Sequence, residues 1–267
     1  DQDLGPRPNH AAGAAVTAAA RRLDPRSHGQ VEGRQRYQRY YRRPESHGFL
    51  PADGPRSGME PHLRAGIAVY NAGATHAAHD AWEDVWLDLP EGSDDERLLH
   101  GLIQFTAAVH HAHERNWSGA VGLSESGRAY LTELSPGYRG VGLSVVTDYL
   151  DALQADPERI ERESPPALTH GGRPLSAADL ELDGIIIAAG VVAADVEAYD
   201  ASVVDAAADY ARSEADEGRT RFIGLLTTFV DESTHRGIVY DRLSRAVDRR
   251  QRKERDVSGL FDVSDDG

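Results

Sequence analysis

The sequence predicts an all-α fold, a helical bundle with a disordered N-terminal extension and additional C-terminal helices. From residue 59 onward, apolar residues recur at helical spacing, and glycine, proline and N-capping residues separate the apolar segments. No stretch shows the strict alternation of polar and apolar residues that a half-buried strand requires. A chain of 267 residues also has enough apolar material to bury a core without cross-links. We therefore expect helices packed on helices.

The first helical region contains five expected helices, several with a signal at one end. Gly73 stops the first helix, Thr75 is the expected N-cap of the second, and Asp94 favours the start of the third by facing its positive end. The expected helices span residues 61–72, 75–88, 94–115, 117–134 and 144–154. Residues 165–174 contain prolines and a glycine pair and are expected to form an extended loop.

A second helical region follows this loop. Its expected helices span residues 177–198, 203–214, 219–230 and 235–254. The chain is accordingly divided into an extension at 1–58, a helical core domain at 59–175 and a C-terminal helical region at 176–267. The basic run at 245–255 is typical of a solvated helix end, with partner binding as the alternative.

The extension differs from the rest of the chain in composition. It carries ten arginines against six acidic residues, has little hydrophobic periodicity, and precedes Met59, the only methionine. This composition favours disorder, or a translated segment upstream of a native start at Met59. The alternative is a single-stranded nucleic-acid arm at 34–43, where arginines alternate with tyrosines.

Residues 59–267 are strongly acidic. They contain 19 basic and 38 acidic residues, and Lys253 is the only lysine of the chain. Such a composition is typical of proteins that remain soluble in high salt, where surface charges are screened. We therefore expect an acidic surface and a halophilic source. Nucleic acid is a poor partner for this region, because an acidic surface repels phosphate.

The composition also excludes several classes of site. The chain has no cysteine, which rules out disulfides, thiolate metal sites and cysteine nucleophiles. No HExxH, P-loop or GxSxG motif occurs. The longest apolar stretch, residues 184–194, is far shorter than the roughly 20 residues of a membrane helix. We expect a cytoplasmic protein with no membrane partner.

A strip of polar residues runs along the expected helix at 75–88. On a helical projection, Trp82 and Trp86 lie on the apolar face, and Asp80 lies on the solvent face. The strip between these faces consists of His76, His79 and Glu83. Such a strip is either part of a site or a satisfied structural cluster, for example with Glu83 accepting a hydrogen bond from His79.

The next expected helix carries a matching polar line. His100, Gln104 and His111 share one face of a helix that is otherwise apolar. Since buried polar side chains need partners, an antiparallel pairing of the two helices is expected to bring the strip and the line together. The residues expected to face one another are His79, Glu83, His111 and Gln104. Histidine and glutamate from facing helices can hold a divalent metal, so a metal site and a structural polar cluster both remain open.

The segment that contains the strip and the line resembles a known family. Its motifs are YNAG at 70–73, AHDAWEDVW at 78–86, GLIQFTAAVHH at 101–111 and RNWSGA at 115–120. They resemble the small helical family catalogued as domain of unknown function 309, over about residues 63–134. Asp80 stands where that family usually has glutamate, and Arg115 stands where it often has glycine.

The resemblance implies a metal-dependent hydrolase, because the family is labelled as a predicted one, and here an acidic, haloarchaeal-type member. The implied ligands of one divalent metal are His79, Glu83 and either His111 or His110. The metal would activate a water for attack on an ester or phosphoester of a small-molecule substrate. Asp80 or Glu83 would be the catalytic carboxylate. The implied supporting residues are Asn71, His76, His100 and Gln104.

The alternative class is a non-catalytic helical interaction or dimerisation module. In that interpretation the His/Glu/Gln cluster is structural and fixes the packing register of the helices or a homodimer contact.

Overall fold

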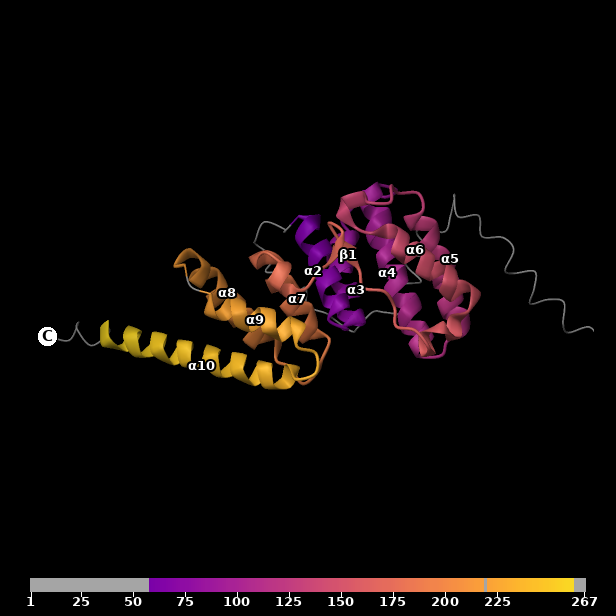
Figure 1. The fold of residues 1–267 in the computed structure, drawn as a ribbon. Helices are drawn as coiled ribbons and strands as arrows, with labels where there is room; N and C mark the ends of the chain where they lie inside the picture. The colour runs from indigo at the N-terminus through magenta and orange to yellow at the C-terminus, as the bar shows by residue number, and fades with distance from the viewer. Residues whose placement is uncertain (1–57, 219, 262–267) are drawn as a thin grey trace, which may run out of the picture. The chain divides into compact units, whose positions relative to one another are not determined.

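The structure, a computed structural model, describes residues 58–218 and 220–261. Its long elements are all helices, which confirms the all-α fold (Figure 1). They are α2 (Met59–Asn71), α3 (Thr75–Trp86), α4 (Asp94–His113), α5 (Trp117–Leu131), α6 (Leu143–Ala155), α7 (Leu182–Ala194), α8 (Ala201–Asp216), α9 (Arg221–Asp231) and α10 (Arg236–Phe261). The interpretations of residues 1–57, as a disordered extension or as a nucleic-acid arm at 34–43, lie outside the described residues.

Helices α2 and α3 together contact helices from both helical regions of the chain, those before residue 175 and those after it. Helix α4 packs against α5, α6 packs against α5, and α3 packs against both α2 and α4. On the other side, α7 contacts α2 and α3, and α8, α9 and α10 contact one another (Figure 1). The helices before and after residue 175 are therefore in direct contact, and α3 and α4, which carry the polar strip and line, are neighbours.

The helix starts follow local capping chemistry. The Ser93 side chain accepts a hydrogen bond from the backbone N–H of Glu96 at the start of α4, and Asn116 does the same for Gly119 at the start of α5. Thr75 is the first residue of α3 and not its N-cap, because Ala74 occupies that position without a side-chain cap. Of the other expected boundaries, the end of α10 differs most, because the helix was expected to end at residue 254 and continues to Phe261.

The segment between α6 and α7 differs from the expected loop and long helix. Residues 165–174 contain a two-residue antiparallel hairpin, β1 (Thr169–His170) and β2 (Arg173–Pro174), which the sequence did not predict. Its turn uses positive φ angles of 60° at Gly171 and 81° at Gly172, which glycine adopts without strain. The expected helix at 177–198 is divided into the short 3₁₀ helix η4 (Ala177–Asp179) and α7. Ser176 and Asp179 form a capping box at the start of η4, and extended backbone at Leu180 and Glu181 separates η4 from α7.

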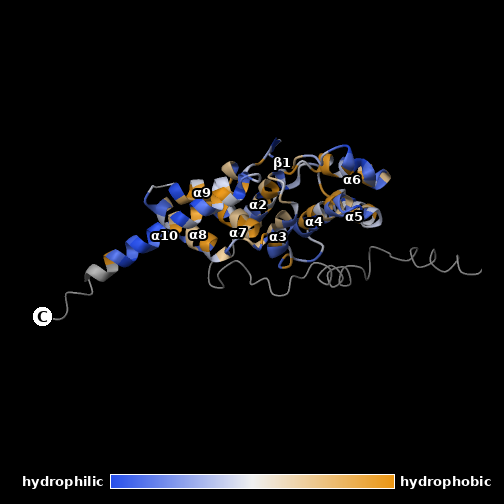
Figure 2. Cartoon of the chain, turned by 90° about the horizontal axis from the view of Figure 1, so that it is seen from below, coloured by the Kyte–Doolittle hydropathy of each residue, from blue (hydrophilic) through white to orange (hydrophobic). Residues whose placement is uncertain are grey.

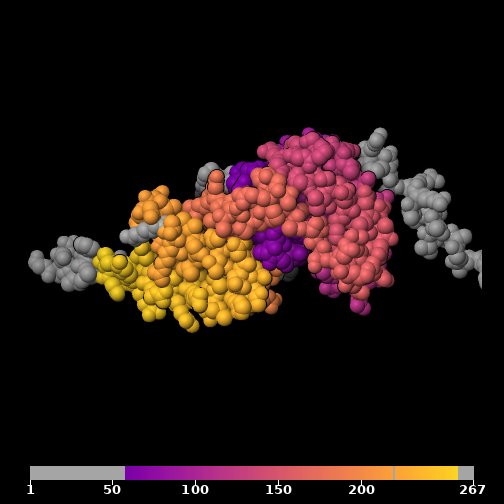
Figure 3. All heavy atoms as spheres, in the orientation of Figure 1, coloured from indigo at the N-terminus to yellow at the C-terminus, as the bar shows by residue number. Residues whose placement is uncertain are grey.

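The core is built from apolar faces of the helices. Trp82, Trp86 and Phe105 are among the largest fully buried side chains, and α7 is apolar around nearly its whole circumference. In the space-filling view α2, in indigo, is largely covered by later segments in magenta and orange (Figure 3). Among the helices that the structure describes, none is both long enough and apolar enough to pass through a lipid bilayer.

Candidate functional site

The polar line of α4 faces α5. The ring of His100 lies against the ring of Tyr130 on α5, with centroids 4.1 Å apart. A Cβ atom on Gly127 of α5 would lie 3.1 Å from the Cβ of Gln104. At the far end of the line, His111 Nδ1 is 2.8 Å from Nδ2 of Asn116, the N-cap of α5. These contacts place the three members of the line against α5, and His100 also acts on the pKa of His79 in the polar strip of α3, which the line was expected to meet.

Small residues explain why α4 and α5 approach so closely. A Cβ on Gly101 would lie 2.5 Å from the Leu131 side chain, and a Cβ on Gly127 would lie 3.3 Å from the carbonyl oxygen of Gly101. Ala120 and Ser124, on the same face of α5, are fully buried. Since the two backbones nearly touch at the glycines, the side chains beside them are enclosed, and the polar line becomes part of the helix interface.

His100 is the centre of a buried polar cluster, which we define as Trp86, Glu96, His100, Gln104 and Tyr130. The indole Nε1 of Trp86 donates a hydrogen bond to Glu96 Oε1 at 3.1 Å, and His100 Nδ1 lies 3.4 Å from the same oxygen. Gln104 Nε2 lies 3.0 Å from His100 Nε2. Because an amide nitrogen can only donate, His100 Nε2 is the acceptor and its proton is on Nδ1, on the side of Glu96.

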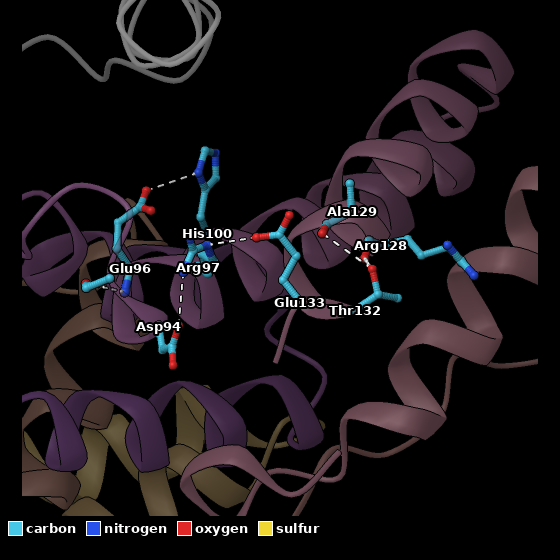
Figure 4. Close-up of polar contacts among 9 residues, drawn as sticks. Asp94, Glu96, Arg97, His100, Arg128, Ala129, Thr132 and Glu133 are labelled. Atoms are coloured by element: carbon cyan, nitrogen blue, oxygen red, sulfur yellow. Dashed lines mark hydrogen bonds and ion pairs between the residues drawn. The ribbon is translucent and has the colours of Figure 1, made fainter. Parts of the chain in front are cut away.

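Two aromatic rings enclose the imidazole of His100. The indole of Trp86, from α3, has its ring centroid 4.7 Å from that of His100, and Tyr130 contacts the ring from α5. Figure 4 shows Glu96 and His100 directed toward one another on α4. The same view shows Arg97, one residue after Glu96, between Asp94 and Glu133, with its Nε 3.1 Å from Glu133 Oε2. The start of α4 is thus tied to α3 and to the end of α5.

The polar strip of α3 points partly toward α7. His76 Nδ1 lies 2.8 Å from Asp195 Oδ1, just after α7, and 3.9 Å from Asp80 Oδ2. His76 and His79 lie with their rings nearly parallel and their centroids 6.4 Å apart. This arrangement joins α3 to α7 through an ion pair that requires protonated His76.

His79 is buried, with 5% of its surface exposed. Burial lowers its pKa to about 3, because desolvation penalises the imidazolium, and the charges of His110 and His100 lower it further. On α4, the charges of His110 and His100 act on the pKa of His79. The expected pairing of His79 with His111 stays a prediction. At neutral pH the imidazole of His79 is uncharged.

Glu83 is partly buried, and its pKa is raised to about 7. Desolvation is the main cause, the carboxylates of Asp80 and Asp84 add to it, and His76 opposes it. Each of these charged groups belongs to α3 itself. The expected approach of Glu83 to His111 and Gln104 of α4 stays a prediction, and Glu83 exchanges its proton near neutral pH.

The expected metal ligands are not gathered at one point. His110 is exposed and His111 partly exposed at the end of α4, and their ring centroids are 5.9 Å apart. Across residues 58–218 and 220–261, no group of three or more histidine, aspartate or glutamate side chains is arranged to hold a metal ion. The donors in this part of the chain do not fit a divalent-metal centre, so no chemical step is derived through one, and metal binding stays a prediction.

Asn71 has a clear structural role. Its Nδ2 donates to the carbonyl oxygens of Leu168 and Leu175, both at 2.9 Å, and its Oδ1 accepts from the N–H of Leu168 at 2.8 Å. These bonds hold both ends of the β1–β2 hairpin against the end of α2. Sequence reasoning placed Asn71 among the supporting residues, but its partners lie about a hundred residues away.

Sequence reasoning missed three members of the buried polar cluster. Glu96 precedes His100 by four residues on one helix, and that spacing could have identified it. Trp86 was assigned to packing alone, although a buried indole N–H needs an acceptor. Tyr130 has no local signal that relates it to His100.

Comparison with known proteins agrees with the resemblance. Residues 63–123, from α2 to the first half of α5, match the model of a family described as "Domain of unknown function (DUF309)". This segment includes α3 and α4 and therefore the polar strip and the polar line. No curated protein matches the chain.

Proposed function

We propose that this chain is a non-catalytic helical interaction module in which the buried polar cluster fixes how α3, α4 and α5 pack. The observation that carries the proposal is the environment of His100, which meets Trp86 of α3 and Tyr130 of α5 while both of its nitrogens face side chains of α4. The polar line of α4 thus contributes to the packing between helices.

A polar cluster suits this role because α4 is buried on most of its circumference. Buried polar groups raise the free energy of every helix packing register except the one in which they meet. They therefore contribute more to the specificity of the packing than to its stability. Here that register places Glu96 beside Trp86 and His100 beside Tyr130.

The proposal is tested by metal analysis and activity measurements on the full chain purified without an affinity tag. We expect no stoichiometric metal, and no turnover of nitrophenyl esters or phosphoesters with added zinc or manganese. A content of about one ion per chain that falls on His79→Ala substitution would overturn the proposal. So would turnover that is lost in Glu83→Gln and retained in the control Glu125→Gln on the exposed face of α5.

A hydrolase is the second candidate, favoured by one observation. Glu83 has a pKa of about 7 and lies one helical turn from the neutral His79. A carboxyl group that titrates near the working pH is suited to general acid or base catalysis on an ester or phosphoester. If Glu83 has this role, the rate should follow a titration near pH 7 that disappears in Glu83→Gln.

We also infer that the module works in the cytoplasm of a salt-adapted cell. Residues 59–267 contain twice as many acidic as basic residues, and the chain has no cysteine.

A further inference from the structure

The C-terminal half of α10 has the opposite charge to the rest of residues 59–267. Residues 242–255 contain seven basic and two acidic side chains, in a chain with a net charge of −15. Residues 251–257 are all exposed, and Figure 2 shows this end of α10 as hydrophilic, beyond the part that packs on α8 and α9. A basic helix on an acidic protein requires a separate explanation.

The inner face of α10 is already occupied. Val239, Leu243 and Val247 are buried in the contact with α8 and α9. Farther along, Arg250 lies over the ring of Tyr210 on α8, at 5.5 Å, and its Nε is 2.7 Å from Glu254 Oε1. The basic residue on this face is therefore used within the fold.

The outer face carries a line of exposed arginines, which we call the arginine line. It consists of Arg242, Arg245, Arg249 and Arg252. At about 100° per residue, these positions lie within about 80° of one another on the helix. Ile238, 54% exposed, precedes them on the same face. The line therefore begins with an exposed apolar side chain, and interfaces commonly combine arginine with apolar contacts.

Three of the four arginines in the arginine line have no ion-pair partner within residues 58–218 and 220–261. Arg242, Arg245 and Arg249 form no ion pair there, and Arg252 has only Asp248 at 3.9 Å. Like charges three or four residues apart on a helix repel one another and slightly destabilise it. The arginine line thus slightly lowers the stability of α10 in the isolated chain. A guanidinium group is suited to bind carboxylate or phosphate, so a partner with either group would offset this effect.

Helix α8 provides a complementary surface, which α10 of the same chain cannot reach. Asp205 and Asp216 are exposed and form no ion pair among the described residues, while the neighbouring Asp209 pairs with Arg212 at 2.9 Å. Tyr210 faces α10, since its hydroxyl donates to Glu254, and the two free aspartates lie roughly 100–140° around α8 from it. They therefore point away from their own α10.

The two surfaces also match in length. With a rise of about 1.5 Å per residue, the arginine line is about 15 Å long, and Asp205 and Asp216 are about 16 Å apart. Guanidinium groups suit both phosphate and carboxylate, so the matching length of the two surfaces, and not charge alone, favours another copy of this chain over a phosphate polymer. Carboxylates on another copy of this chain are suitable, since each copy carries both surfaces.

We propose that the arginine line of α10 docks on Asp205 and Asp216 of α8 in a second copy of this chain, in a symmetric dimer that repeats this contact twice. In a two-fold dimer, each copy contributes the same patch, so both contacts form together. The inference rests on the proposed function and names the partner of the interaction module.

The test uses two charge-reversed variants of the full chain. Arg245→Glu/Arg249→Glu removes the net positive charge of the arginine line and places two carboxylates at its centre, and Asp205→Arg/Asp216→Arg replaces both aspartates of the α8 surface with arginines. In sedimentation velocity at low salt, we expect the wild type to dimerise and each variant alone to be monomeric, because its contacts join like charges. Mixing the two variants should restore a dimer, since both contacts of the mixed pair join opposite charges.

The control is Arg221→Glu/Arg255→Glu, which changes the net charge equally at exposed positions away from the arginine line. It should dimerise like the wild type. The proposal is overturned if the wild type is monomeric at every concentration, if the mixed variants stay monomeric, or if the control also dissociates. Retention of duplex DNA by a monomeric wild type, lost in Arg245→Glu/Arg249→Glu, would assign the line to nucleic acid and overturn it too.

These outcomes are independent of the test of the proposed function. A monomeric protein without metal or turnover would overturn only the docking inference. A dimer that hydrolyses esters would overturn only the non-catalytic assignment.

Discussion

The imidazole of His100 stacks on the ring of Tyr130 with centroids 4.1 Å apart, although the two residues belong to different helices and are 30 positions apart in sequence. This contact places the polar line of α4 against α5. The contact can form only if α4 and α5 approach closely. Substitution of a glycine between the two helices tests this close approach.

Gly127→Ala should destabilise the protein by about 1–3 kcal/mol, because the added Cβ would lie 3.1 Å from the Cβ of Gln104 and 3.3 Å from a backbone oxygen. The matched control is Gly122→Ala in the same helix, where a Cβ would meet nothing within 4 Å. There the better helix propensity of alanine should stabilise the protein by up to about 1 kcal/mol. Urea unfolding measures both, and equal effects of the same sign would contradict the close packing.

Asn71→Ala should cost about 1–3 kcal/mol, because it leaves backbone groups of Leu168 and Leu175 without their hydrogen bonds. Hydrogen exchange should show faster exchange of the Leu168 amide in particular. Ser118→Ala, an exposed substitution on α5, is the control and should have little effect. An unchanged Leu168 exchange rate would mean that Asn71 does not hold the hairpin.

Glu83 should make stability depend on pH in a defined direction. Its pKa is about 7 in the folded protein against an ordinary value of 4.5, so the folded state binds the proton more tightly than the unfolded state. Glu83 therefore lowers the free energy of unfolding as pH rises from about 4.5 to about 7. Glu83→Gln should be more stable than the wild type by about 1–3 kcal/mol at pH 8 and equal to it at pH 4.

Urea unfolding at these pH values measures the effect, with Glu125→Gln as the matched control. A Glu83→Gln protein that is less stable than the wild type at pH 8 would contradict this account, because it would mean that a cation stabilises the carboxylate.

Salt should stabilise the protein. The excess of acidic residues in 59–267 is self-repelling when it is not screened, so the melting temperature should rise with potassium chloride. The rise should be steepest at low concentration, where the screening length falls most rapidly. Thermal unfolding at a series of salt concentrations checks this, and a melting temperature independent of salt would contradict it.

The fold class was predictable because the signals for helices are local. The periodicity of α4 identified it as a central helix, and the spacing of His100, Gln104 and His111 identified a real polar line. The S-x-x-E pattern from Ser93 to Glu96 and the Ser176 capping box are also local signals, although neither entered the prediction.

The partners of the polar line were not predictable in the same way. A helical projection gives the direction of a side chain but does not say which neighbouring helix lies in that direction. The glycine contact between Gly101 and Gly127 decides that α5 lies there, and it depends on two residues in different helices. The same limit applies to Asn71, whose partners lie in a hairpin too short to have a sequence pattern of its own.

The central claim is that His100 holds α3, α4 and α5 together through the buried polar cluster without a metal. The most direct test is the free energy of unfolding of the wild type, His100→Ala and the exposed control His113→Ala, each with and without a chelator. We expect His100→Ala to lose about 2–4 kcal/mol through its cavity and the lost polar contacts, His113→Ala to stay within about 0.5 kcal/mol, and the chelator to change nothing. A wild type that the chelator destabilises to the level of His100→Ala, or a His100→Ala protein as stable as the wild type, would contradict the claim.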